Sequence, residues 1–160
     1  MTSLVTPFNS ALESGVRSLF VLAEHFPTSC DIERLVDFDY LTVHSGDFDD
    51  EYPSLHAPVP TRAGELLVRR DLVERGVLLM ASRRLAERHV TSGGFSYRAT
   101  DEASAFLNGL VTPYSKMLRE RAKWVMSEFG TLTRAELRLR ISSVFHVSQF
   151  ETFTGSGAPS

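Results

Sequence analysis

The amino-acid sequence predicts a mainly helical, α+β fold, and three observations support this class. Apolar residues recur at spacings of three and four along several segments, as they do on one face of an α-helix. An alternating stretch from Phe95 to Thr100 follows a Ser-Gly-Gly turn, which predicts a two-stranded hairpin. A helix-start signal, Thr100-Asp101-Glu102, comes directly after it. This order, in which a hairpin follows several helices and precedes another, predicts a winged helix-turn-helix domain with the hairpin as its wing.

Length and composition set the expected domain organisation. The chain has 160 residues, 42% of them hydrophobic, which suits one packed domain with an added helical extension. We expect a winged-helix domain over residues 1–111, a C-terminal helical extension over 112–150 and a disordered tail over 151–160.

The first two predicted helices precede a long irregular stretch. One runs from Asn9 to His25, and its start carries the capping-box spacing of Ser10 and Glu13. The other begins near Asp31 and ends at Ser45-Gly46, where we expect the glycine to be the C-cap.

The third predicted helix is the longest and leads to the wing. It runs from Thr61 or Arg62 to about Arg84 and is apolar on more than one face, which indicates a central position or an interface. At the hairpin turn, Gly93 and Gly94 provide the positive-φ positions that a tight turn needs.

The last two helices are marked by their N-terminal residues. Thr112 followed by Pro113 predicts a helix from Pro113 to Phe129, with Lys116, Arg119, Arg121 and Lys123 placed around an apolar stripe. Thr133 and Glu136 form a second capping box, which predicts one more helix.

Residues 46–62 form a long irregular stretch with three prolines and several acidic groups. Long loops in compact domains are often functional or else disordered. Phe48, Tyr52 and Leu55 are spaced along this one, and they would either pin the loop to the body or contact a partner.

The charge is unevenly distributed. Residues 1–60 contain ten acidic and two basic side chains, whereas residues 61–160 contain ten acidic and fifteen basic ones, for a net charge of −3. This predicts a molecule with an acidic end and a basic end. Arginine is far commoner than lysine, which suits phosphate or carboxylate recognition but also follows from a GC-rich coding genome.

No motif for catalysis is present, and we expect neither enzyme activity nor a cofactor. His44, Asp47, Asp49 and His56 do not have the spacing of a zinc or calcium site, which favours a solvated acidic loop over a metal-dependent enzyme. The single cysteine, Cys30, is expected to be structural.

DNA binding is the alternative that the winged-helix interpretation raises. In such domains the helix before the wing enters the major groove and the wing contacts the backbone. The uncharged wing tip and the negative net charge disfavour this, and they leave a stand-alone DNA-binding regulator as the second hypothesis. The candidate DNA-contacting residues are Arg83, Arg84, Arg88 and Arg98.

Location and assembly follow from what the sequence lacks and from its apolar faces. No apolar run is long enough to span a membrane and the N-terminus does not resemble a secretory signal, so we expect a cytoplasmic protein. The third helix and the helix Pro113–Phe129 suggest a homodimer.

Three motifs carry a family resemblance. They are Tyr-Leu-x-Val-His-Ser-Gly-Asp (Tyr40–Asp47), Ser-Leu-His-x-Pro-Val-Pro (Ser54–Pro60) and Gly-Glu-Leu-Leu-Val-Arg-Arg (Gly64–Arg70). Together with their flanks, over about residues 8–145, they resemble the middle component, of the second type, of bacterial ABC-three-component systems.

The resemblance implies a role that periodicity cannot reveal. Such systems encode an SMC-like ABC ATPase, an effector that is often a nuclease, and a small middle component, and they are similar to Lamassu-type anti-phage defence systems. The middle component would be a non-catalytic adaptor between the ATPase and the effector, which it would hold inactive until foreign DNA is sensed.

The distinctive motif positions are the partner-binding candidates. An alternative stays open for Tyr40, His44 and His56, because buried polar groups need partners and these three would then hydrogen-bond the loop onto the body. The candidates are Tyr40, His44, Asp47, Leu55, His56, Arg69 and Arg70.

Overall fold

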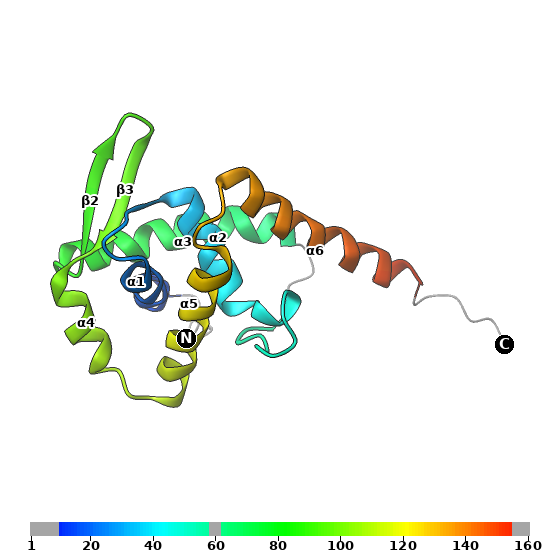
Figure 1. Cartoon of the computed structure of the whole chain (residues 1–160), viewed down its shortest axis with the longest axis horizontal. Helices are drawn as coiled ribbons and strands as arrows, with labels where there is room; N and C mark the ends of the chain where they lie inside the picture. Colours follow the sequence, from blue (N-terminus) through cyan, green and yellow to red (C-terminus); the bar gives the residue numbers. More distant parts are fainter. Residues whose placement is uncertain (1–9, 58–61, 155–160) are drawn as a thin grey trace, which may run out of the picture.

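The computed structural model describes residues 10–57 and 62–154, with side chains described for 10–57 and 66–144. These residues form a mainly helical structure with one small antiparallel sheet (Figure 1), which confirms the predicted α+β class. The elements are α1 (Ala11–His25), β1 (Cys30–Asp31), α2 (Ile32–Val43), the short 3-10 helix η1 (Ser45–Asp47), α3 (Arg62–Ser82), β2 (Ala86–Thr91), β3 (Gly94–Ala99), α4 (Asp101–Asn108), α5 (Pro113–Phe129) and α6 (Arg134–Thr154).

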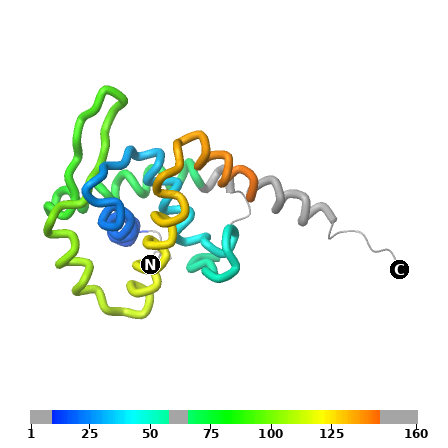
Figure 2. Tube along the Cα trace, viewed as in Figure 1, coloured from blue at the N-terminus to red at the C-terminus, as the bar shows by residue number. Residues whose placement is uncertain are grey.

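The sheet has the strand order β1-β3-β2, with both pairings antiparallel. β2 and β3 form the predicted hairpin, which projects from the helical body (Figure 1 and Figure 2). β1 was not predicted, because two residues are too short to show an alternating pattern. It pairs Cys30 with Tyr97 and Asp31 with Ser96, and so anchors the base of the hairpin to the start of α2.

Side-chain hydrogen bonds cap the predicted starts of α1, α5 and α6, whereas Thr100 at the predicted start of α4 makes no such bond. The Glu13 amide donates to the Ser10 hydroxyl oxygen (3.1 Å), and the Ser115 amide donates to that of Thr112 (3.1 Å). The capping box at α6 is complete, because the Glu136 amide donates to Thr133 Oγ1 and the Thr133 amide donates to the Glu136 carboxylate.

Two helix ends differ from the prediction. α2 ends at Val43 with His44 as its C-cap, so the expectation of a glycine C-cap at Gly46 was wrong. A Cβ on Gly46 would lie 2.9 Å from the amide nitrogen of Ser54, so this glycine permits a close approach of the loop instead. α3 ends at Ser82 in a Schellman-type turn, in which Arg84 (φ +63°) occupies the left-handed position usually taken by glycine. At the hairpin turn, Gly94 has positive φ (+120°) as predicted, whereas the expectation of a positive φ at Gly93 was wrong.

A single hydrophobic core joins the helices and the base of the sheet. α1 crosses α3 so closely that a Cβ on Gly15 would lie 2.5 Å from the carbonyl oxygen of Gly76. α5 packs on α1 and α2 as part of the same core, on both sides of the sequence boundary proposed at residues 111 and 112.

α6 continues this packing and then leads away from the body (Figure 1). Leu137 and Ile141 are its buried side chains among those described. The helix runs to Thr154, four residues into the stretch expected to be a disordered tail, and residues 155–160 lie outside the described part of the chain.

Candidate functional site

A buried ionic cluster joins α1, α2 and α3. Arg17 Nε lies 3.0 Å from Asp39 Oδ1, and Arg69 Nη1 lies 2.6 Å from Asp39 Oδ2. Asp39 is fully buried, and burial alone would raise the pKa of its carboxyl; the two guanidinium groups outweigh burial and lower that pKa. The carboxylate therefore stays ionised and holds three helices together.

The segment Ser45–Ala57, which we call the pinned loop, is held against the body by aromatic and backbone contacts. Tyr52 stacks on Trp124 with ring centroids 5.3 Å apart, and Phe48 meets Phe129 edge to face. The amides of Leu55 and His56 both donate to the carbonyl of Val43. Of the two roles considered for this loop, the described contacts show attachment to the body.

A buried arginine of α5 completes the attachment. Arg121 Nε donates to Ser45 Oγ (3.1 Å), and Nη2 donates to the carbonyl of Pro53 (2.9 Å). The sequence pattern placed Arg121 beside the apolar stripe with the solvent-facing basic residues, but only 5% of it is exposed. The two loop oxygens, together with the Glu120 carboxylate 3.2 Å from Nη1, satisfy its guanidinium, which explains how a charged residue is buried here.

Of the two motif histidines, His44 is the C-cap of α2 and His56 lies in the pinned loop, with their ring centroids 6.4 Å apart. His56 Nε2 is 2.9 Å from the hydroxyl oxygen of Tyr114, and the two rings stack nearly parallel. Burial, reinforced by the charge of Arg17, lowers the pKa of His56 to about 4, so its imidazole is neutral at pH 7. His44 packs against the ring of Tyr40, with centroids 4.7 Å apart.

The structure buries three of the seven partner-binding candidates and partly buries three more. The described contacts of Tyr40, His44 and His56 lie within the chain, as the hydrogen-bonded alternative expects, and direct partner contact stays a prediction for all seven candidates. Arg70 differs, because it is exposed and pairs with Glu33 at 2.7 Å. Tyr40, His44 and Arg69 are buried, whereas Asp47, Leu55 and His56 are partly buried.

The four candidate DNA-contacting arginines lie at the end of α3 and on the hairpin. Arg83 and Arg84 are exposed beyond α3. The guanidinium of Arg88 lies over the ring of Phe95, 4.3 Å from its centroid. Arg98 pairs with Glu87 at 2.8 Å, so its charge is already balanced within the hairpin.

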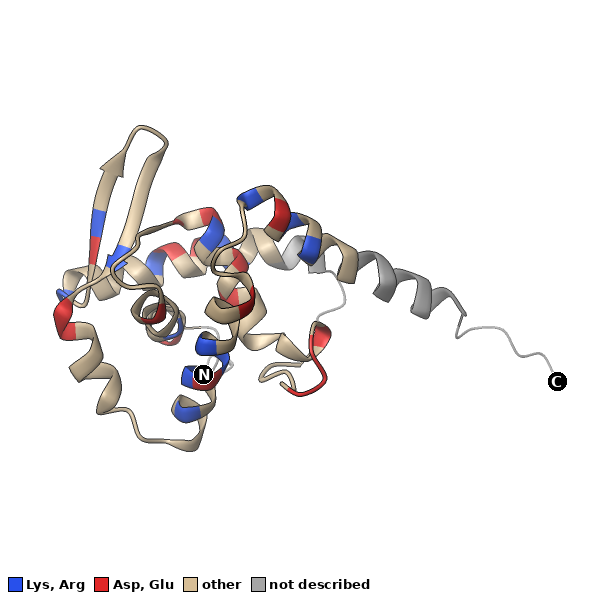
Figure 3. Ribbon diagram, viewed as in Figure 1, with Lys and Arg blue, Asp and Glu red and all other residues tan. Residues whose placement is uncertain are grey.

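The outer half of the hairpin, residues 90–95, has no charged side chain and exposes two apolar ones. Residues 90–97 contain no Lys, Arg, Asp or Glu, and the outer part of the ribbon is accordingly tan in Figure 3. Val90 lies opposite Phe95 in the register, and the two are 82% and 48% exposed. Sequence periodicity suggested that Phe95 shares a half-buried face with Tyr97, but the hairpin extends beyond the body at this point and leaves Phe95 in solvent.

The sequence model of one protein family, described as ABC-three component (ABC-3C) system Middle Component 2, matches residues 7–151. The chain belongs to this family. No curated protein and no solved structure matches it. As a middle component of a three-component system, the protein works together with partner proteins.

Three further findings concern metal binding, the cysteine and membrane-spanning helices in this middle component. Across residues 10–57 and 66–144, whose side chains the structure describes, no three His, Cys, Asp or Glu residues come together as a metal ion would require. Cys30 is buried, which raises the pKa of its thiol to about 12, and this fits a structural residue. In the part of the chain that the structure describes, no helix has the length and apolar character needed to cross a membrane.

Proposed function

We propose that this middle component is a non-catalytic, cytoplasmic adaptor that joins an SMC-like ABC ATPase to an effector, often a nuclease, in an anti-phage defence complex similar to Lamassu. Membership of the Middle Component 2 family, over residues 7–151, is the observation that carries the proposal. The order α1, α2, α3 and then a hairpin, with β1 added as a third strand, supports a winged-helix interpretation of the fold.

The outer half of the hairpin is the surface best suited to one of these partners. Exposed apolar and aromatic side chains at the tip of a projecting element are typical of protein interfaces. A wing that binds DNA needs basic residues to neutralise phosphates, and residues 90–97 have none. We therefore assign Val90 and Phe95 to a protein contact.

Co-purification of the tagged protein with the SMC-like ATPase and the effector of the same operon tests this proposal. We expect a complex that survives size-exclusion chromatography. The double variant Val90→Ser/Phe95→Ser should weaken it at least tenfold, because it removes the apolar anchors while the hairpin keeps its backbone pairing. Val111→Ser, at an exposed residue between α4 and α5, is the matched control and should leave the complex intact. Wild-type protein that never associates with the ATPase would refute the adaptor role.

The second candidate is a stand-alone DNA-binding regulator, which the exposed Arg83 and Arg84 beside the hairpin favour. It predicts tight binding of the isolated protein to duplex DNA, with affinity falling steeply as salt rises. We expect weak binding instead, because Arg98 is paired with Glu87 and the net charge is −3. Nanomolar affinity for a duplex at 150 mM salt, measured by fluorescence anisotropy, would favour the regulator.

A further inference from the structure

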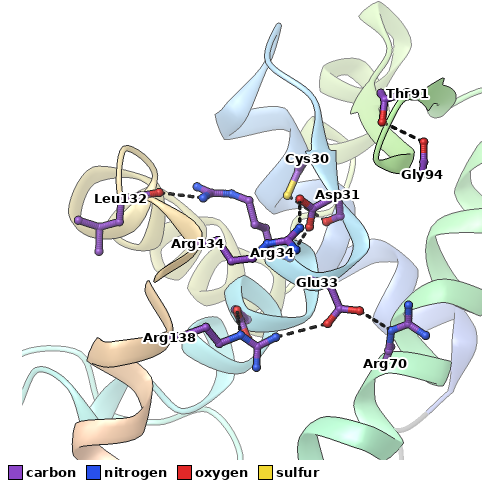
Figure 4. Close-up of polar contacts among 11 residues, drawn as sticks. Cys30, Asp31, Glu33, Arg34, Arg70, Thr91, Gly94, Leu132, Arg134 and Arg138 are labelled. Atoms are coloured by element: carbon purple, nitrogen blue, oxygen red, sulfur yellow. Dashed lines mark hydrogen bonds and ion pairs between the residues drawn. The ribbon is translucent and has the colours of Figure 1, made fainter. Parts of the chain in front are cut away.

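The start of α2 presents an acidic surface that α6 covers. Arg134 Nη2 lies 2.6 Å from Asp31 Oδ2. Arg138 bridges two more carboxylates, with Nη2 at 3.4 Å from Glu33 Oε2 and Nε at 3.1 Å from Asp37 Oδ2. Figure 4 shows Arg134 and Arg138 reaching from α6 toward Asp31 and Glu33. The contact between α6 and α2 is thus largely ionic.

The burial of the Asp37 carboxylate is an energetic cost of this contact. Its side chain is 1% exposed, yet neither carboxylate oxygen accepts a hydrogen bond. The charged groups around it are Arg138 of α6 and, on its own side, Asp31, Glu33 and Arg34. Burial raises the pKa of Asp37 to about 6 in spite of Arg138, because the arginine does not replace the lost water. At neutral pH, release of α6 would return this carboxylate to solvent.

The remaining attachments of α6 are modest. Among its described side chains, Leu137 and Ile141 are the buried ones. Arg134 and Arg138 are 58% and 41% exposed, and ion pairs this exposed to solvent stabilise a structure little. Two buried aliphatic side chains, the guanidinium of Arg140 over the ring of Phe129 (5.0 Å) and solvent-exposed ion pairs are therefore what offsets the cost of burying Asp37.

The turn before α6 is held more firmly than α6 itself. Arg34 of α2 donates from Nη1 to the carbonyl of Leu132 (2.8 Å) and from Nη2 to that of Gly130 (3.4 Å). Figure 4 shows Arg34 and Leu132 joined in this way. A movement of α6 would therefore pivot after Leu132 and leave α5 in place.

We propose that the first turns of α6 are a releasable latch, and that their release opens the Asp31–Glu33–Asp37 surface of α2 to a helix of a partner protein that bears arginine or lysine. The chemistry of the occupant follows from α6 itself, since Arg134 and Arg138 show which groups this surface accepts. The inference stands on the contacts between α2 and α6 and does not depend on which proteins the adaptor joins.

Hydrogen exchange measured by mass spectrometry on the full chain tests the latch. At pH 7.5, residues 134–144 should exchange at least tenfold faster than the core of α5. Asp37→Asn should slow exchange in residues 134–144 at least threefold, and the difference from wild type should vanish at pH 5, where Asp37 is protonated. Asp50→Asn, at an exposed residue, is the control. Equal protection of α6 and α5, or no effect of Asp37→Asn, would overturn the latch.

A labelled peptide of residues 131–144 tests the acidic surface in trans. The full-length variant Arg134→Glu/Arg138→Glu should bind this peptide at least tenfold more tightly than wild-type protein does, because its own α6 no longer covers α2. A peptide with the same two substitutions should not bind. If the charge-reversed variant has a native circular dichroism spectrum but does not bind the peptide, the proposed binding surface on α2 is refuted. If that variant fails to fold, the hydrogen-exchange result for Asp37→Asn still tests the latch. Crosslinks between α6 and α2 of two copies of the wild type would overturn the assignment to a partner protein.

Discussion

Asp39 illustrates how single residues in this protein depart from the rule that charged side chains lie at the surface. It sits between Phe38 and Tyr40 in an apolar stretch of α2. Its partners have apolar residues at helical spacing: Arg17 lies three positions before Phe20, and Arg69 lies three positions after Leu66. An isolated buried charge is strongly destabilising, but a carboxylate with two guanidinium partners is compensated. The sequence singled out Arg69 but not Arg17 or Asp39. Their burial could have been predicted from the fact that all three lie within apolar stripes of their helices.

Replacing Asp39 with asparagine should therefore destabilise the protein strongly. The variant leaves Arg17 and Arg69 buried without an anion, which costs about 3–5 kcal/mol of unfolding free energy. Urea denaturation followed by circular dichroism measures this loss. Asp50→Asn, at an exposed position, should change stability by less than about 0.5 kcal/mol. Equal stability of the two variants would mean that the cluster does not hold the helices together.

Helix packing depends on close backbone contact between α1 and α3. A Cβ on Gly76 would lie 2.5 Å from the amide nitrogen of Gly15 and 2.8 Å from the carbonyl oxygen of Ala11. Those atoms belong to the backbone and cannot rotate away. Two ordinary-looking glycines inside predicted helices thus set the distance between the helices that carry the hairpin and the ionic cluster.

Gly76→Ala should separate α1 from α3 and lower the unfolding free energy by about 1–3 kcal/mol, despite the better helix propensity of alanine. Thermal and urea unfolding report the change. Gly93→Ala is a suitable comparison, because a Cβ there would meet nothing within 4 Å and its φ is not in the left-handed region. If Gly76→Ala were as stable as Gly93→Ala, the close crossing would have no energetic consequence.

Most elements could be predicted from local patterns, whereas their relations could not. Ser10, Thr112 and the Thr133–Glu136 box marked helix starts because capping depends on residues three positions apart. β1 escaped prediction because it exists only through its pairing with β3. The burial of Arg121 was missed for the same reason, since its partners Ser45 and Pro53 lie far away in the sequence.

At the scale of the whole molecule, the acidic first part of the chain and the basic remainder neutralise each other internally. Arg70 pairs with Glu33 and Arg134 pairs with Asp31, so the charge asymmetry of the sequence does not become two separate poles there. The acidic and basic parts of the sequence are therefore not separated in space at α2, where acidic residues pair with arginines from the basic part. Sequence alone could not show this, because it carries no information on which distant charges meet.

Opposed titrations shape the stability of the whole molecule between pH 4 and 6.5. His56, with its pKa lowered to about 4, resists protonation in the native state, so stability decreases as pH falls from the unfolded pKa of about 6.5. His25, whose pKa is lowered by burial and by Arg34, acts in the same direction. Asp37 acts oppositely, because its raised pKa lets the native state bind a proton as pH falls through about 6.

The contribution of His56 can be isolated with His56→Gln. At pH 7.5 the variant should lose about 1 kcal/mol, because the contact with Tyr114 is weakened. This deficit should shrink as pH falls toward 4.5, since wild type then loses stability that glutamine cannot lose. Urea titrations at a series of pH values measure the difference, with His89→Gln on the exposed hairpin for comparison. A deficit that grows toward acid would contradict the neutral, buried state of His56.

Cys30 gives the protein a built-in chemical probe of its own integrity. The chain has one cysteine, it lies where β1 meets β3, and its thiol is inaccessible and protonated at pH 7.5. Alkylating reagents attack thiolates, so the native protein should resist iodoacetamide for as long as this strand pairing is closed. The rate of alkylation therefore measures how often the junction between the hairpin and the body opens. A partner that binds the hairpin should change this rate, and no engineered label is needed to detect it.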